Sequence, residues 1–258
     1  MRKAAAIFVL ILFLILPGRL FAALSFTLTD SAGDNVDRTS YAVPVTGSFT
    51  PVSGSLYYLF IWGGKATTPD IPTVTGTNGW NATWTNEASV TFATIASPTK
   101  RLTAFSGVAS SSTAGVFTVD FAGTTQLGIA WSLIQVTGNA ASGYTVQVKT
   151  GNANNPTSLT VTLDSAFADA NNQNLSGIGF NDARTVAPGT DFTELSDITV
   201  TVPSGGLETN NKLNDTSCDW TWTGGGSHVG AISIEVAVAA APGGCTGSRL
   251  ALMGVGGC

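Results

Sequence analysis

The sequence predicts an all-β fold, an antiparallel β-sandwich of jelly-roll type. Roughly a dozen short extended segments follow one another, with Gly, Pro, Asn and Asp between them. No amphipathic helix is visible beyond one short turn near residues 165–174. No repeat of fixed period appears, and no linker divides the chain before residue 239. We therefore expect one sandwich domain over residues 24–238.

The stretch 113–136 carries the clearest strand pattern. Residues 117–121 alternate between apolar and polar side chains, which is the period of a strand with one wet face. In residues 127–136, large side chains alternate with mostly small ones, which predicts a strand covered on both faces. The connection 122–126 is short and contains a glycine, so we expect the two strands to form an antiparallel hairpin.

The other segments also have strand patterns. Segment 55–62 is an almost unbroken apolar run and is predicted to be buried. Segment 41–49 carries Pro44, which suits an edge strand or a bulge. Further strands are expected at 25–29, 74–85, 89–95, 101–108, 144–149, 158–163, 177–181, 197–202, 218–222 and 229–238.

Residues 1–23 match a secretory signal peptide. Two basic residues precede an apolar run over residues 4–16, and small residues follow it. The run is shorter than the about 20 residues that a transmembrane helix needs. We expect cleavage after residue 22 or 23 and a secreted or cell-surface protein. An uncleaved N-terminal anchor is the alternative, and it would export the domain as well.

The composition describes a polar but weakly charged exterior. Charged residues make up 10% of the chain, hydrophobic residues 43%, and the net charge is −5. About 25% charged residues is typical of soluble domains. No cluster of Lys or Arg follows the leader, so neither nucleic acid nor an anionic membrane surface is an expected partner.

Six segments share a recognisable order. They are Gly-Ser-Leu-Tyr-Tyr-Leu-Phe-Ile-Trp (54–62), Gly-Trp-Asn-Ala-Thr-Trp (79–84), Lys-Arg-Leu-Thr-Ala-Phe (100–105), Gly-Val-Phe-Thr-Val-Asp-Phe (115–121), Ala-Trp-Ser-Leu-Ile-Gln-Val-Thr-Gly (130–138) and Gly-Ala-Ile-Ser-Ile-Glu-Val (230–236). Together they resemble a recurrent extracellular β-sandwich module of secreted bacterial or phage-associated proteins. The resemblance implies a fold and no catalytic residue, so no site is carried over from it.

The sequence shows no catalytic set. His228 is the only histidine and lies in a glycine-rich loop before the last strand. A Ser-His-Asp triad would need this residue, and the Gly-x-Ser-x-Gly elbow is missing. No Cys-x-x-Cys spacing suggests zinc. We therefore expect a protein that is not an enzyme.

Four tryptophans are the candidate ligand-binding residues. Trp80 and Trp84 flank Asn-Ala-Thr, and Trp220 and Trp222 alternate with threonine. Aromatic rings among Asn, Asp and Thr suit stacking on a sugar ring. The alternative is that one member of each pair packs inward and the other shields a sheet edge. Trp80 is the strongest candidate because a turn precedes it.

Calcium is the one cofactor that the sequence suggests. Asp30, Asp34, Asn35 and Asp37 lie within one eight-residue region, and calcium takes six to eight oxygen ligands. Two further groups of carboxylates lie near residues 164–171 and 182–197. None of the three groups matches an EF-hand loop, so solvated turn carboxylates are the alternative interpretation.

Residues 239–258 are predicted to form a flexible tail that contains Gly and Cys. In an exported chain, Cys245 and Cys258 could form a disulfide, which leaves Cys218 free. Alternatively, Cys218 is a buried thiol and the tail cysteines pair between chains.

These observations favour an exported, non-enzymatic structural or adhesive surface protein, for which self-assembly or a protein or glycan partner is open. A carbohydrate-binding module that uses the four tryptophans is the second hypothesis. A glycoside hydrolase with two facing carboxylates ranks third.

Overall fold

The computed structural model describes residues 23–44, 47–93 and 99–240, and these residues form an all-β protein. The strands are β1 (Ser25–Asp34), β2 (Ser40–Val43), β3 (Leu56–Gly64), β4 (Thr73–Gly76), β5 (Thr85–Phe92), β6 (Lys100–Val108), β7 (Phe117–Asp120), β8 (Gly128–Thr137), β9 (Thr145–Ala153), β10 (Ser158–Thr162), β11 (Gln173–Phe180), β12 (Ala187–Pro188), β13 (Thr193–Thr201), β14 (Ser204–Leu213), β15 (Ser217–Thr221) and β16 (Val229–Val236). A single 3₁₀ turn, η1 (Asn78–Trp80), precedes β5 in this part of the chain. The predicted antiparallel β-sandwich is confirmed.

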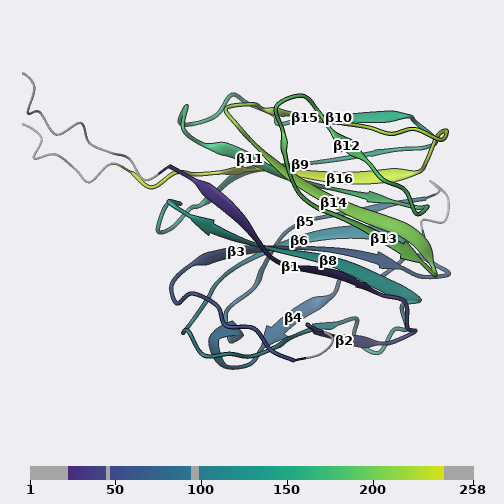
Figure 1. Cartoon of the computed structure of the whole chain (residues 1–258), viewed down its shortest axis with the longest axis horizontal. Helices are drawn as coiled ribbons and strands as arrows, with labels where there is room; N and C mark the ends of the chain where they lie inside the picture. The colour runs from purple at the N-terminus through teal and green to yellow at the C-terminus, as the bar shows by residue number, and fades with distance from the viewer. Residues whose placement is uncertain (1–22, 45–46, 94–98, 241–258) are drawn as a thin grey trace, which may run out of the picture.

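Four sheets are stacked in layers (Figure 1). The two inner sheets have five strands each, in the orders β1-β8-β3-β6-β5 (the first inner sheet) and β13-β14-β11-β16-β9 (the second inner sheet). A three-stranded outer sheet covers each of them: β2-β7-β4 (the first outer sheet) and β10-β15-β12 (the second outer sheet). Three apolar clusters fill the spaces between them, which we call the central layer, the first outer layer and the second outer layer.

Each half of the chain is a hairpin wrapped around itself, as in a jelly roll. In the first half, β1 pairs with β8, β2 with β7 and β3 with β6. Of the two remaining strands, β4 pairs with β7 in the outer sheet, and β5 joins the inner sheet beside β6. The jelly-roll-like order expected from the sequence is therefore present within one half of the chain.

The second half repeats this topology strand by strand. β9 pairs with β16, β10 with β15 and β11 with β14, while β13 joins the inner sheet beside β14. Every strand thus occupies the position of the strand eight places earlier. The contacts between the inner sheets have the same symmetry, because β1 lies against β13 and β5 against β9. The two halves of the chain therefore share one topology and are related by an approximate twofold arrangement.

The four layers explain the long apolar runs. β3 and β8 are central strands of the first inner sheet, with the central layer on one face and the first outer layer on the other. Both strands were expected to be buried, and nearly all their residues are.

The expected hairpin between residues 117–121 and 127–136 is wrong. β7 belongs to the first outer sheet and β8 to the first inner sheet, so the connection 122–126 carries the chain from one layer to the next. Their side-chain pattern does suit strands, but it does not identify their hydrogen-bonding partners. β14 was not expected, because its sequence, Ser-Gly-Gly-Leu-Glu-Thr-Asn-Asn-Lys-Leu, is mostly polar.

Large residues of the first half fit against glycines of the second half in the central layer. A Cβ atom at Gly177 would lie 2.6 Å from Phe60 Cδ1, and one at Gly179 would lie 2.9 Å from Trp62 Cδ1. A Cβ atom at Gly230 would overlap the ring of Phe92. The two inner sheets therefore have complementary surfaces here: the first contributes aromatic rings, and the second contributes glycines that leave room for them.

The edges of the inner sheets are irregular. The pairing register shifts in β1 between Leu28 and Asp30, in β5 between Asn86 and Ala88 and in β13 between Glu194 and Ser196. The pairing of β9 with β16 shifts as well. Bulges interrupt the row of free backbone groups on an edge strand, so these irregularities oppose edge-to-edge association.

The expected signal peptide lies outside the described residues, except for Ala23, and so does most of the expected tail. Among the residues described, no helix has the length and apolar character needed to cross a membrane.

Candidate functional site

The four candidate tryptophans lie in two layers at opposite sides of the stack. Trp80 and Trp84 belong to the first outer layer, and Trp220 and Trp222 to the second. Trp80 and Trp220 have 0% exposure and Trp222 has 7%. A ring stacks on a sugar only when its face is open, so the four side chains do not form the exposed platform that the sequence suggested.

Trp80 is a core residue of the first half. The turn η1 inserts its ring between Phe49, Tyr57 and Phe117, in edge-to-face contacts with centroid distances of 4.7, 4.8 and 5.9 Å. Its Nε1 donates to the Phe49 carbonyl at 3.0 Å. Trp84 is half-buried beside the same cluster. The polar residues next to Trp80 in the sequence prompted the sugar-binding hypothesis. They belong to the turn at the surface, whereas the ring itself lies in the core.

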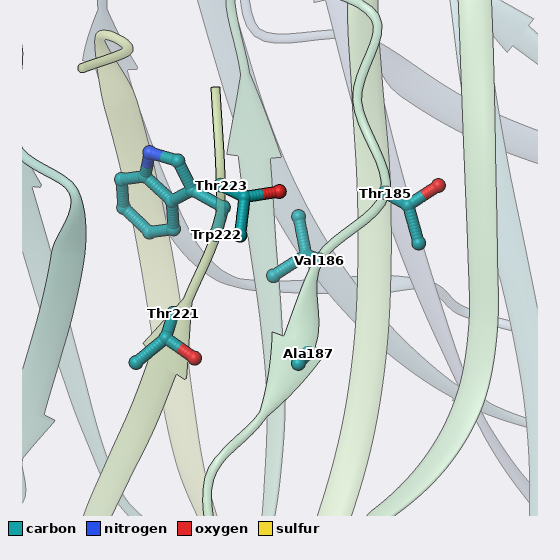
Figure 2. A pocket seen from close by; sticks show the side chains of 6 residues that line it. All are labelled: Thr185, Val186, Ala187, Thr221, Trp222 and Thr223. Atoms are coloured by element: carbon teal, nitrogen blue, oxygen red, sulfur yellow. The ribbon is translucent and has the colours of Figure 1, made fainter. Parts of the chain in front are cut away.

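Trp222 lines a pocket of about 330 Å³ in the second half, beside Thr185, Val186, Ala187, Thr221 and Thr223. Figure 2 shows the pocket between segments 185–187 and 221–223, with the hydroxyl groups of Thr221 and Thr223 on the side of the other segment. The ring itself contacts Phe180 edge to face at 5.1 Å and has the Arg184 guanidinium 6.0 Å above it. The pocket therefore offers the hydroxyl groups of Thr221 and Thr223 beside Val186 and Ala187, while the Trp222 ring points away from segment 185–187.

Behind this pocket lies a buried polar cluster in the second outer layer. The Asn210 amide donates to Glu208 Oε1 at 3.3 Å, and the Cys218 thiol donates to Asn210 Oδ1 at 3.3 Å. On the neighbouring strands, Ser176 and Ser233 both donate to Asn174 Oδ1, at 2.6 and 2.8 Å.

Glu208 is the exceptional member of this cluster. Its side chain has 0% exposure, and Oε2 has no hydrogen-bond partner in the part of the chain that the structure describes. Burial raises the pKa of Glu208 to about 8, and the nearby Glu194 and Asp197 carboxylates act in the same direction. Asp197 lies directly opposite Glu208 in the β13–β14 pairing, and burial raises its pKa too.

Of the two acids, Asp197 is the one that contacts a residue of the pocket. Its Oδ2 accepts a hydrogen bond from the backbone N–H of Val186 at 3.4 Å, and Val186 lines the pocket. Sequence reasoning grouped Asp197 with other turn carboxylates and did not single out Glu208. The only available signal was an isolated acid in an undetected strand, and burial cannot be read from that.

The first half serves as an internal reference for this layer. Its equivalent layer is filled by apolar and aromatic side chains, among them Tyr57, Leu59, Ile61, Phe105 and Trp131. The same topology therefore packs this layer without a fully buried, unpaired carboxyl group, since the buried carboxylate of the first half, Asp34, is paired with Arg38. Glu208 and its neighbours are a property of the second half and are not a requirement of the fold.

Two of the four proposed calcium ligands, Asp30 and Asp34, have protein partners. Asp34 Oδ1 accepts from the Val36 backbone N–H at 2.9 Å, and its Oδ2 accepts from Arg38 Nε at 3.3 Å. Asp30 Oδ2 accepts from Trp131 Nε1 at 2.7 Å. Within residues 23–44, 47–93 and 99–240, no three His, Cys, Asp or Glu side chains are grouped to hold a metal ion. These contacts assign Asp30 and Asp34 to the structure of β1 and the turn after it.

Asp34 and Arg38 also line a second pocket, of about 290 Å³, together with Ser40, Ala42 and Thr118. This pocket opens on the first outer sheet. Each outer sheet therefore has a pocket beside it.

His228 and Cys218 do not form a reactive centre. His228 Nδ1 contacts Asn154 Oδ1 at 3.1 Å. Cys218 is buried and free, and burial raises the pKa of its thiol well above the usual value, which makes the thiol inert. A free Cys218 is common to both alternatives drawn from the sequence, and its burial was part of the second one. The expected Cys245–Cys258 disulfide lies outside the described residues.

The exposed faces of the two outer sheets have the same chemistry. On the first, Asp120 lies between Ser40 and Thr73, and Thr118 lies between Ala42 and Thr75. On the second, the rows are Thr160–Asp219, Thr162–Ser217 and Ser158–Thr221–Ala187. Each face thus presents small residues, hydroxyl groups and one central aspartate.

Comparison with known proteins identifies no relative. A scan against protein-family models gives no match, and neither curated proteins nor solved structures match the chain significantly.

Proposed function

We propose that the protein is an exported, non-enzymatic surface protein that acts by contact, as a structural or adhesive subunit. The observation that carries the proposal is the pair of equivalent outer faces, which lie at opposite ends of the four-sheet stack (Figure 1). A rigid body with the same chemistry at both ends suits the bridging of two surfaces or two neighbouring subunits.

The physical character of the faces supports this role. Hydroxyl groups and short side chains lose little conformational entropy when a partner covers them, in contrast to lysine or glutamate. The expected export and the weakly charged exterior are consistent with a structural or adhesive role at a cell surface. Bivalent contact strengthens weak binding without any new type of contact.

The test uses one lysine on each face. Thr75→Lys alters the first face and Thr162→Lys the second, and both residues are exposed. Adsorption of the secreted protein to its producing cells, and bridging of those cells into aggregates, would be measured. Each single variant should keep adsorption but lose bridging, and the double variant should lose both. The control is Thr27→Lys, an exposed position on β1 outside both faces. A parent protein that binds no cell and forms no assembly would contradict the proposal.

A second candidate is carbohydrate binding at the Trp222 pocket. The hydroxyl groups of Thr221 and Thr223 opposite the apolar side chains of Val186 and Ala187 favour it, since sugars combine apolar edges with hydroxyl groups. A glycan array with the parent protein and Thr221→Val would test it. Binding that is lost in Thr221→Val would support this candidate, and no binding by the parent protein would end it.

A further inference from the structure

The second outer layer contains an acid pair that the first outer layer lacks. Asp197 and Glu208 are direct cross-strand neighbours, and cross-strand neighbours on one face have Cβ atoms about 5 Å apart. Two carboxylates at this separation, one of them with 0% exposure, cannot both ionise without a large cost. The structure therefore favours one retained proton.

A second observation points to the same place. Glu208 Oε2, Trp220 Nε1 and Trp222 Nε1 are buried polar atoms without a hydrogen-bond partner among the described residues. Most buried polar atoms in proteins have a partner. All three side chains belong to the interface between the second inner and the second outer sheet. In the first half, Trp84 Nε1 and Gln126 Oε1 also lack partners, so Glu208 Oε2, the one carboxyl oxygen in this set of described atoms, is what distinguishes the second interface.

We propose that the Asp197–Glu208 pair retains one proton, carried by Glu208, while the second outer sheet is closed over it, and that release of this proton to solvent accompanies the opening of the sheet beside Val186. The acid pair would make this half of the molecule responsive to pH. The first half, with its apolar layer, would stay closed over the same range.

The groups around the pair determine the direction of the response. On β13, Glu194 and Asp197 oppose ionisation of Glu208; on β14, Asn210 donates to it. From the second outer sheet, the Cys218 thiol lies within electrostatic reach of Glu208. None of these described neighbours carries a positive charge. Deprotonation therefore adds an uncompensated buried charge, and the closed arrangement becomes less favourable as the pH rises.

One hydrogen bond connects the acid pair to the pocket beside Trp222. The Val186 N–H donates to Asp197, and β12 begins at the next residue. β12 pairs with β15 over only two residues, Ala187 and Pro188. This short strand is the weakest hydrogen-bonded attachment in the second outer sheet, so opening is expected to begin here.

Amide hydrogen exchange of the full chain between pH 5 and pH 9 tests the proposal. After correction for the intrinsic rate, exchange in segments 185–188 and 218–222 should rise by up to about tenfold per pH unit and level off above about pH 8. Segment 117–120 of the first half is the internal control and should show no such rise. In Glu208→Gln, the rise should disappear from the second half.

Asp197→Asn keeps an oxygen for the Val186 N–H and removes the neighbouring charge. Exchange in this variant should level off at lower pH and rise less in total, since Glu208 then ionises more easily. A merely structural role of either residue would not move this midpoint. An unchanged pH profile in either variant, or a parent protein whose two halves respond alike, would overturn the proposal. If Glu208→Gln does not fold, the midpoint shift in Asp197→Asn decides.

Discussion

The indole ring of Trp62 in β3 occupies the space that a side chain at Gly205 in β14 would need. The same tryptophan donates from Nε1 to the Phe180 carbonyl at 2.9 Å. Trp62 of the first half thus packs against the backbone of β14 and is hydrogen-bonded to the backbone of β11, both in the second half. This relationship fixes how the two inner sheets pack on each other.

We expect Gly205→Ala to lower the free energy of unfolding by about 1–3 kcal/mol, because the added methyl group would overlap the Trp62 ring. Gly63→Ala is the matched control. Gly63 is also a buried glycine in an inner sheet, but its Cβ would lie 3.7 Å from Phe121 Cζ, an ordinary contact. Urea denaturation of both variants would measure the difference. Equal stability of the two variants would show that the Trp62 ring does not pack tightly against Gly205.

Trp62→Phe should cost about 1–3 kcal/mol, because it leaves the buried Phe180 carbonyl without its indole donor. In combination with Gly205→Ala, the total loss should be smaller than the two separate losses, since the smaller ring makes room for the methyl group. Chemical denaturation of the four proteins in this double-mutant cycle gives the coupling. Strict additivity would argue against direct contact.

Trp80→Ala should destabilise the protein by about 3–5 kcal/mol, because the ring fills the core of the first outer layer. Thermal unfolding followed by circular dichroism would measure the loss. An unchanged melting temperature would contradict the burial of Trp80 and would again make it a candidate ligand-binding residue.

The free energy of unfolding should depend on pH through Glu208. Burial raises its pKa from the ordinary 4.5 to about 8, so the folded protein holds the proton more tightly than the unfolded chain. The resulting stabilisation is fully present below about pH 4.5 and is lost at up to about 1.4 kcal/mol per pH unit until about pH 8. Glu208→Gln should not show this decline. Urea denaturation from pH 5 to pH 9 compares the two slopes, and parallel curves would be the contrary result.

Much of the local structure could be predicted from side-chain patterns. Alternation in residues 117–121 and the apolar run 55–62 correctly indicated strands, because the two-residue period depends only on local geometry. The polar strand β14 was missed for the same reason: its inward-facing Glu208 and Asn210 resemble surface residues until the second outer sheet covers them.

The tryptophan hypothesis shows the limit of such patterns. Trp80 and Trp220 have polar neighbours in sequence, yet both rings have 0% exposure. Neighbours in a strand such as β15 point to opposite faces, and the turn η1 directs the Trp80 ring inward, so a polar neighbour says little about where either ring lies. The candidate acid pair joins two strands across the sheet, and only the pairing of β13 with β14 places Asp197 opposite Glu208.

The sequence by itself determined that this chain forms antiparallel strands with a weakly charged exterior, since strand period and composition are local properties. The tertiary structure alone decided that the strands form two equivalent halves, β1–β8 and β9–β16. The shared topology is invisible in the sequence because the halves pack as opposites, with the ring of Phe60 in β3 set against Gly177 in β11. Complementary packing requires different residues at the two meeting faces, so equivalent strands carry different sequences although they share one topology.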